Sequence, residues 1–416
     1  MTADASSSPG PAPRVALVHD WLTGMRGGEK VLDALCELFP EAPLYTLLHV
    51  KGSVSQRIES RRIVTSPVQR LPGARRLYRH LLPLYPAVVE TFDFEGYDLV
   101  VSSSHCAVKS VVTPHAVHVC YCHSPMRYAW DQFGEYFGPR QVGAVASRVL
   151  RPVMAAMARW DAATAYRPSR FVANSQYVAG RIGRYYNRRS TVVYPPVDTE
   201  FFRPSDDEDP PASSARHVLV VSALVPYKRV DLAIDACRKL RVPLKIAGSG
   251  PELARLRART AGGEVEFLGW KSDEETRQLY RAASAVLLPG VEDFGLVPVE
   301  AQACGTPVVA LGEGGACETV VPGVTGTLAA GRSLDAFADA LERALATPFD
   351  RAAIRANAVR FSRPRFLTEF RAIVDDALNG AGLAEATRRR ENSPESGGSA
   401  ARWPQGGFAA RRENKR

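Results

Sequence analysis

A chain of 416 residues has room for two domains of ordinary size and for tails at both ends. It is 45% hydrophobic and 23% charged, which is typical of a globular enzyme, and its net charge of +9 indicates acidic partners such as phosphates or anionic lipid. No apolar run approaches the roughly 18 residues of a membrane span, and the first thirteen residues lack Lys and Arg, which argues against a signal peptide.

The cysteines favour a reducing compartment. There are seven, an odd number, and Cys120 and Cys122 are too close for an easy mutual disulfide. We therefore expect a cytoplasmic protein. His123 follows these two cysteines, but no second ligand pair with zinc spacing occurs, so we predict no metal site.

The first half of the chain alternates short apolar strands with helical segments. A strand is predicted at 14–18, and a helix at 29–39 follows Gly27 and Gly28. Further strands are predicted at 97–101, 117–121, 171–173 and 191–193. This alternation is typical of a parallel sheet.

A second α/β series follows an acidic, proline-rich linker at 205–215. Its helix at 229–240 places five apolar side chains on one face. Its strands are predicted at 217–221, 244–247, 265–268, 285–288 and 307–310. We therefore predict an α/β chain with two Rossmann-like, doubly wound domains, at 14–204 and 216–360.

The remaining segments are also assigned. A C-terminal helix at 361–380 is expected to pack back on the first domain. Disorder is expected at 1–13 and in a basic tail at 384–416, because Arg, Ser, Gly and Glu dominate the tail and apolar anchors are few.

The most informative motif follows the predicted strand at 285–288. Glu292 and Glu300 stand eight positions apart, Pro298 fits the first turn of a helix, and Gly305 fits its end. Glu292 and Gly295 would then lie in a turn at the carboxyl end of a strand, where open α/β sheets bind ligands. The alternative is a surface loop with two solvated acids.

Three other segments are candidate binding loops. Lys228 and Arg229 lie in a turn that opens a helix, and Gly248 and Gly250 form a tight turn after a strand. A solvated cation and an ordinary βα turn are the alternatives. The glycines at 27–28 leave N–H groups free at a helix start, but their spacing and the lack of a following acid count against a nicotinamide or flavin enzyme.

Together these motifs resemble the retaining, nucleotide-sugar-dependent glycosyltransferases of family 4, which have the GT-B fold. The resemblance covers about 15–378 and implies that two domains face across a donor cleft. It implies that Lys228 reaches the donor diphosphate, that Glu300 holds the ribose, and that Glu292 and His123 bind sugar hydroxyls. The other donor-binding residues it implies are Gly27, Gly28, Arg229, Gly248, Gly250, Phe294, Gly295 and Leu296.

The chain departs from the family at Ala223, where many members carry an Arg. Whether Arg229 replaces that cation stays open. The loop with Gly314, Gly315 and Glu318 also resembles a family segment, and no role is assigned to it. No cofactor or divalent metal is expected, since cations and helix dipoles would take its place.

The family resemblance implies retention of configuration. A double displacement would need a nucleophile with a supporting base, and the sequence offers no obvious one. Front-face departure and attack through an oxocarbenium-like ion pair is the commonly proposed alternative, and it asks the protein to neutralise the leaving diphosphate and orient the sugar.

The segments at 19–22, 27–30, 122–128 and 225–231 resemble the branch that includes O-antigen and exopolysaccharide mannosyltransferases. The resemblance implies GDP-mannose as donor and a lipid-linked oligosaccharide as acceptor at the inner membrane face. The alternatives are a transferase-like scaffold without catalysis and another GT-B enzyme that uses a UDP-sugar.

Two arginine-rich segments of the first domain, 57–79 and 140–170, carry one acid each. Apolar residues interleave with the arginines, which favours contact with an anionic membrane surface. Solvated helices are the alternative, and no nucleic-acid recognition motif occurs. We assign the membrane contact to Arg75, Arg76 and Arg79 and expect a peripheral protein.

Overall fold

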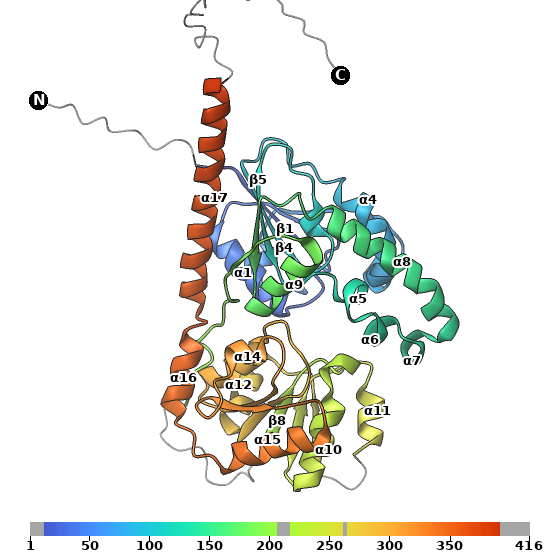
Figure 1. Cartoon of the computed structure of the whole chain (residues 1–416), viewed down its shortest axis with the longest axis vertical. Helices are drawn as coiled ribbons and strands as arrows, with labels where there is room; N and C mark the ends of the chain where they lie inside the picture. The colour runs from blue at the N-terminus through green and yellow to red at the C-terminus, as the bar shows by residue number, and fades with distance from the viewer. Residues whose placement is uncertain (1–11, 206–216, 261–263, 392–416) are drawn as a thin grey trace, which may run out of the picture.

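The computed structural model describes residues 12–205, 217–260 and 264–391, which form two α/β domains, one above the other in Figure 1. The first domain contains a seven-stranded parallel sheet in the order β3-β2-β1-β4-β5-β6-β7. Its strands are β1 Val15–His19, β2 Leu44–Thr46, β3 Ile63–Thr65, β4 Leu99–Ser104, β5 Val117–Cys122, β6 Arg170–Ala173 and β7 Thr191–Val192. Its helices include α1 Gly27–Leu38, α3 Ala74–Leu77, η2 Tyr78–Leu84, α4 Tyr85–Val89, α5 Arg127–Trp130, α6 Phe133–Phe137, α7 Pro139–Val142, α8 Ala144–Ala163 and α9 Gln176–Tyr186.

The second domain contains a six-stranded parallel sheet in the order β10-β9-β8-β11-β12-β13. Its strands are β8 Val218–Val221, β9 Leu244–Ala247, β10 Val265–Gly269, β11 Ala285–Leu288, β12 Val308–Leu311 and β13 Gly326–Ala329. Its helices include η4 Pro226–Lys228, α10 Val230–Leu240, α11 Leu253–Ala258, α12 Asp273–Ala282, α13 Leu296–Ala303, α14 Ala316–Thr319, α15 Leu334–Ala346 and α16 Arg351–Val359.

Each sheet is covered by helices on both faces. Successive residues of a strand face opposite sides, so Leu17 packs with α1 and with Phe366 and Phe370 of α17 (Arg363–Glu391), while Val18 packs with η2, α4 and α8. In the second domain, α10 and α15 cover one face, and α13 and α16 cover the other. Strands buried on both faces read as continuous apolar runs, which is why the sequence revealed them.

The chain crosses between the domains twice, and the two crossings lie side by side. The Val197 N–H donates to the Phe361 carbonyl at 2.9 Å, and the Arg363 N–H donates to the Val197 carbonyl at 3.0 Å. From there α17 runs back along the first domain and contacts α1 and β5 (Figure 1).

The predicted α/β class with two Rossmann-like domains is confirmed. The short strands β2, β3 and β13 were not predicted. The tail prediction is wrong at its start, because α17 stays helical to Glu391 rather than ending before 384. Residues 384–391 consist mainly of Ala, Glu and Arg, which are good helix formers. The rest of the predicted tail, most of the 1–13 segment and most of the linker lie outside the described residues.

Candidate functional site

The candidate site lies where the strand order of each sheet reverses direction. In the first sheet this point lies between β1 and β4, and in the second between β8 and β11. Ligands of doubly wound sheets bind at the carboxyl ends of strands at such points. Glu292 follows β11, Lys228 lies in the connection after β8, and the start of α1 follows β1.

The turn that carries Glu292 is shaped by glycines. Gly295, with φ of +88°, precedes α13, and Glu300 is buried within that helix. The loop with Gly314 and Gly315 packs directly on the turn, and the Gly315 N–H donates to the Glu292 carbonyl at 2.8 Å. A Cβ at Gly315 would collide with the backbone at 293–294, so close packing accounts for this glycine.

Lys228 pairs with Glu292. Its ammonium donates a hydrogen bond to the Glu292 carboxylate, so the predicted phosphate cation and the predicted sugar-binding acid neutralise each other in this structure. Arg229 has φ of +51° and turns its side chain to Asp231, with Nε 3.3 Å from Oδ1. The Lys228 ammonium therefore reaches the Glu292 turn, and the Arg229 guanidinium is engaged elsewhere.

The predicted glycines of the first domain lie at the same cleft. A Cβ on Gly27 would stand 3.3 Å from a side-chain carbon of Leu296 in the second domain. A Cβ on Gly28 would stand 3.4 Å from the His19 ring and 3.7 Å from His123 Nε2. These positions bring the N-terminus of α1, α13 and His123 together.

His123 ends a chain of polar contacts below the cleft. Its Nε2 is 2.8 Å from the Ser103 hydroxyl, which is 3.1 Å from His19 Nδ1, and His19 Nε2 is 3.8 Å from Glu29. Burial, and next the neighbouring His105, hold the pKa of His123 well below its usual range. His123 is therefore neutral.

The other predicted residues have different surroundings. Gly248 and Gly250 press against the backbone of 222–224, so close packing of two loops requires both glycines. Phe294 is buried in the core beneath α13. These placements explain the residue types without a ligand, and the binding roles stay predictions.

Three contacts across the cleft were not foreseen from the sequence. Lys30 Nζ donates to Glu300 Oε1 at 2.8 Å, and the Arg127 guanidinium forms an ion pair with Asp293. In the third contact, the Glu318 carboxylate accepts the two N–H groups at the start of α9, at 2.7 and 2.9 Å. Residues 270, 166 and 142 positions apart cannot be paired from spacing alone. The available signal was that Lys30, Arg127 and Glu318 are charged residues within motifs and had no assigned partner.

Burial would lower the pKa of Lys30, but the Glu300 and Asp273 carboxylates outweigh it and raise that pKa. Burial opposes the charge on Arg127 in the same way, and Asp293 raises its pKa above the usual range. Both cations therefore remain charged inside the cleft.

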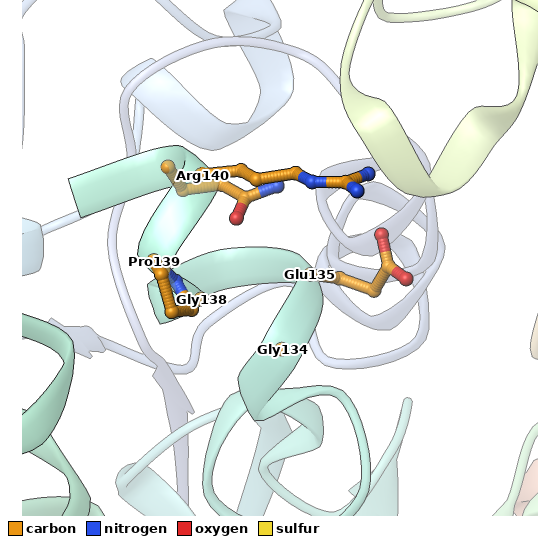
Figure 2. Close-up of a pocket in the computed structure, with 6 residues that line it drawn as sticks. Gly134, Glu135, Gly138, Pro139 and Arg140 are labelled. Carbon is orange, nitrogen blue, oxygen red and sulfur yellow. The ribbon is translucent and has the colours of Figure 1, made fainter. Parts of the chain in front are cut away.

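A hollow lies beside the cleft in the first domain. It is lined by α6, α7 and the residues between them, and Figure 2 shows Glu135 and Arg140 extending to the same side of this turn. None of the predicted site residues lines it. Arg75, Arg76 and Arg79 lie in α3 and η2, all three are exposed, and none of them lines the hollow.

Within 12–205, 217–260 and 264–391, no group of three or more His, Cys, Asp or Glu side chains is placed to hold a metal ion. Among the helices in these ranges, none combines the length and hydropathy that a membrane crossing requires.

Sequence models of two protein families match the chain. The model described as Glycosyltransferase Family 4 matches residues 25–201, and the model described as Glycosyl transferases group 1 matches residues 203–361. The chain belongs to these glycosyltransferases. The two matches meet near the first crossing between the domains.

Curated relatives of this glycosyltransferase include a protein named D-inositol 3-phosphate glycosyltransferase from Frankia alni, 40% identical over 198 residues. That match covers 41% of this chain and 48% of the relative. A relative of the same name from Mycobacterium bovis is 38% identical over 173 residues, 38% of this chain and 36% of its own length. The chain thus spans about half or less of the curated relatives it matches.

Solved structures show the same fold. HepE from Anabaena, solved with UDP and glucose, has a TM-score of 0.65 at 21% identity and covers 88% of this chain and 100% of its own. Sucrose-phosphate synthase from Thermosynechococcus elongatus has a TM-score of 0.59 at 19% identity and covers 90% of this chain and 100% of its own. The GT-B arrangement of this glycosyltransferase is thereby confirmed.

Proposed function

We propose that this glycosyltransferase moves a hexose from a nucleotide-sugar donor to a lipid-linked or oligosaccharide acceptor, with retention of configuration, in cell-surface polysaccharide synthesis. One observation carries the proposal. Glu292 lies in the turn before α13, Glu300 lies in α13, and Lys228 pairs with Glu292. This turn and helix face the start of α1 and His123 across the cleft.

Each group has a role in this reaction. The Lys228 ammonium and the N–H groups at the start of α1 stabilise the negative charge that grows on the leaving diphosphate. Glu300 accepts hydrogen bonds from the ribose hydroxyls, and Glu292 and the neutral His123 orient the sugar. When the donor enters, its diphosphate takes over Lys228, and Glu292 is released to bind sugar hydroxyls.

The donor is the finer part of the proposal. The motif resemblance supports GDP-mannose. A UDP-sugar is the second candidate, and it is favoured by the HepE structures, which were solved with UDP and glucose and with UDP-glucose.

The acceptor is proposed to bind on the first domain, and the hollow at α6–α7 offers a concave surface beside the cleft for it (Figure 2). The arginines of α3 and η2 support peripheral binding to the cytoplasmic face of an anionic membrane, where a lipid-linked acceptor resides. The curated relatives are named for an inositol phosphate, so a small phosphorylated acceptor belongs in the same test.

A donor panel tests the proposal. The purified protein is incubated with GDP-mannose, GDP-glucose, UDP-glucose, UDP-galactose and UDP-N-acetylglucosamine, and released nucleoside diphosphate is measured with and without acceptors. Release from one donor with retained anomeric configuration in the product supports the proposal. Nucleotide binding without turnover of any donor would instead indicate a scaffold that has lost catalysis.

A further inference from the structure

Among the described residues of the second domain, one side-chain cation pairs with Glu292. Lys228 is that cation, and Arg229 is held by Asp231 with 41% of its side chain exposed. A nucleoside diphosphate carries more than one negative charge, and this charge grows as the sugar departs. One ammonium therefore leaves part of it unbalanced, so a second nearby cation would lower the barrier.

Arg127 of the first domain and Lys228 of the second lie near the same aromatic ring. The Arg127 guanidinium carbon is 5.8 Å from the centroid of the Tyr227 ring, and Lys228 Nζ is 5.4 Å from the same centroid. The Tyr136 ring of α6 stacks on Tyr227 with centroids 5.7 Å apart. The two cations thus approach one aromatic ring from different domains.

Most hydrogen-bond donors of Arg127 are uncommitted in the described structure. Its Nη2 contacts Asp293 Oδ2 in an ion pair, and no hydrogen bond of the described residues uses the other N–H groups of the guanidinium. Asp293 is 5% exposed, whereas 23% of the Arg127 side chain is exposed. A charged guanidinium with free donors at a partly open position is suited to phosphate oxygens, which it binds in a bidentate manner.

We propose that Arg127 supplies the second cation to the donor diphosphate, from the first domain across the cleft. This inference rests on the proposed function and adds a binding residue to its site. Asp293 holds the guanidinium in place through its ion pair and continues to orient it when the phosphates bind. Because Arg127 reaches the second domain only when the domains are apposed, diphosphate binding also favours the closed arrangement.

Calorimetry with UDP, uridine, GDP and guanosine tests the inference. Arg127→Gln should weaken binding of whichever diphosphate the wild type prefers by about tenfold or more, and leave its nucleoside unchanged, since only phosphate contacts are lost. Arg170→Gln is the matched control. It removes the same charge from the same domain. Arg170 lies at the amino end of β6, whereas the cleft lies at the carboxyl ends of the strands. Equal diphosphate affinity in Arg127→Gln and the wild type would overturn the inference.

Restoring a cation elsewhere distinguishes a phosphate contact of Arg127 from a purely structural pair with Asp293. Adding Ala223→Arg to Arg127→Gln places a new cation in the turn before Lys228, and diphosphate affinity should recover in part. Asp293→Asn leaves the guanidinium and should keep most of the affinity. If Asp293→Asn lost as much affinity as Arg127→Gln, and Ala223→Arg rescued nothing, Arg127 would be only a structural contact between domains.

Two measurements keep the test independent of folding and of the proposed function. The double variant Arg127→Gln with Asp293→Asn removes the unpaired buried acid, and its thermal unfolding midpoint is compared with that of the wild type. If this folded variant bound diphosphate as well as the wild type, the inference would fail. A wild type that bound neither nucleoside diphosphate would contradict the proposed function itself.

Discussion

Lys30 of the first domain and Glu300 of the second are joined across the cleft by a hydrogen bond of 2.8 Å. Lys30 also lies 3.4 Å from Asp273 at the start of α12. The carboxylate that we assign to the donor ribose therefore accepts a hydrogen bond from the Lys30 ammonium in this structure. Donor binding must displace this ammonium or share the carboxylate with it, and this exchange can be measured.

We expect Glu300→Gln to weaken nucleotide binding by about tenfold. The Glu300 carboxylate would accept charge-assisted hydrogen bonds from two ribose hydroxyls. The neutral amide of Gln makes weaker hydrogen bonds. Titration of UDP and GDP in a calorimeter measures the change. Glu369→Gln on α17 is the control, because its partner Arg365 lies outside the cleft. Unchanged nucleotide affinity in Glu300→Gln would remove the ribose role.

Lys30→Gln should have the opposite effect. It frees Glu300 Oε1 from Lys30, while the Tyr280 hydroxyl still donates to Oε2, so nucleotide affinity should rise severalfold if the ribose competes with the ammonium for this carboxylate. The same titration measures it, with Lys239→Gln as a control that breaks an exposed ion pair on the second domain. A fall in affinity would show that Lys30 itself contacts the donor.

The sequence was sufficient for the fold and for one side of the site. Strands such as β1 and β11 are continuous apolar runs, and the turn at Glu292 has its glycine and proline within a few residues. The short strands β2 and β3 have only three residues each, too few for a periodic signal. Nothing in the sequence pairs Lys30 with Glu300 or Arg127 with Asp293, because these contacts depend on how two separately folded domains meet.

Lys228→Met should lower kcat by at least tenfold more than it raises KM. The charge on the diphosphate grows as the glycosidic bond breaks, so the ammonium stabilises the transition state more than the bound donor. Steady-state kinetics with the best donor of the panel measure both constants. Lys228→Arg keeps the charge and should retain more activity than Lys228→Met. Equal effects on kcat/KM and on donor affinity would indicate ground-state binding.

Buried neutral histidines should make the protein less stable in acid. Burial, and next the Lys109 ammonium, lower the pKa of His118 to about 3, and its Nε2 lies 2.7 Å from the Ser102 hydroxyl. The unfolded chain, with a histidine pKa of about 6.5, binds the proton first. Below that pH the free energy of unfolding therefore falls, by up to about 1.4 kcal/mol per pH unit for each such histidine.

Urea unfolding of the full chain at pH 7.5 and pH 5.5 measures this loss. His118→Gln removes one of these titrating groups and should reduce the pH dependence, even if the variant is less stable at both pH values. A wild type equally stable at both pH values would show that the histidines titrate normally in the folded protein.

The arginine-rich segment of the first domain divides into two parts in the structure. Arg57 is bound to Asp33, and Arg61 donates to carbonyl groups at the end of α1, so these two arginines stabilise the fold. In α3 and η2, by contrast, the arginines at 75, 76 and 79 are exposed beside Leu71, Leu77 and Leu84, which are 44%, 49% and 48% exposed. Exposed arginine and leucine side chains together favour an anionic lipid surface over water alone.

We therefore expect the protein to bind vesicles that contain anionic lipid at low salt, and to leave them as the salt concentration rises, since this attraction is screened within about 8 Å at physiological ionic strength.

Replacing Arg75, Arg76 and Arg79 with Gln should reduce vesicle binding and transfer to a lipid-linked acceptor, because each arginine near the surface contributes about 1 kcal/mol. Nucleotide affinity should stay the same, since none of the three lies at the cleft. The matched control replaces three exposed arginines of the second domain, Arg238, Arg241 and Arg257. If both triple variants bound vesicles as the wild type does, or if binding did not depend on salt, the arginines of α3 and η2 would be solvated surface residues without a membrane role.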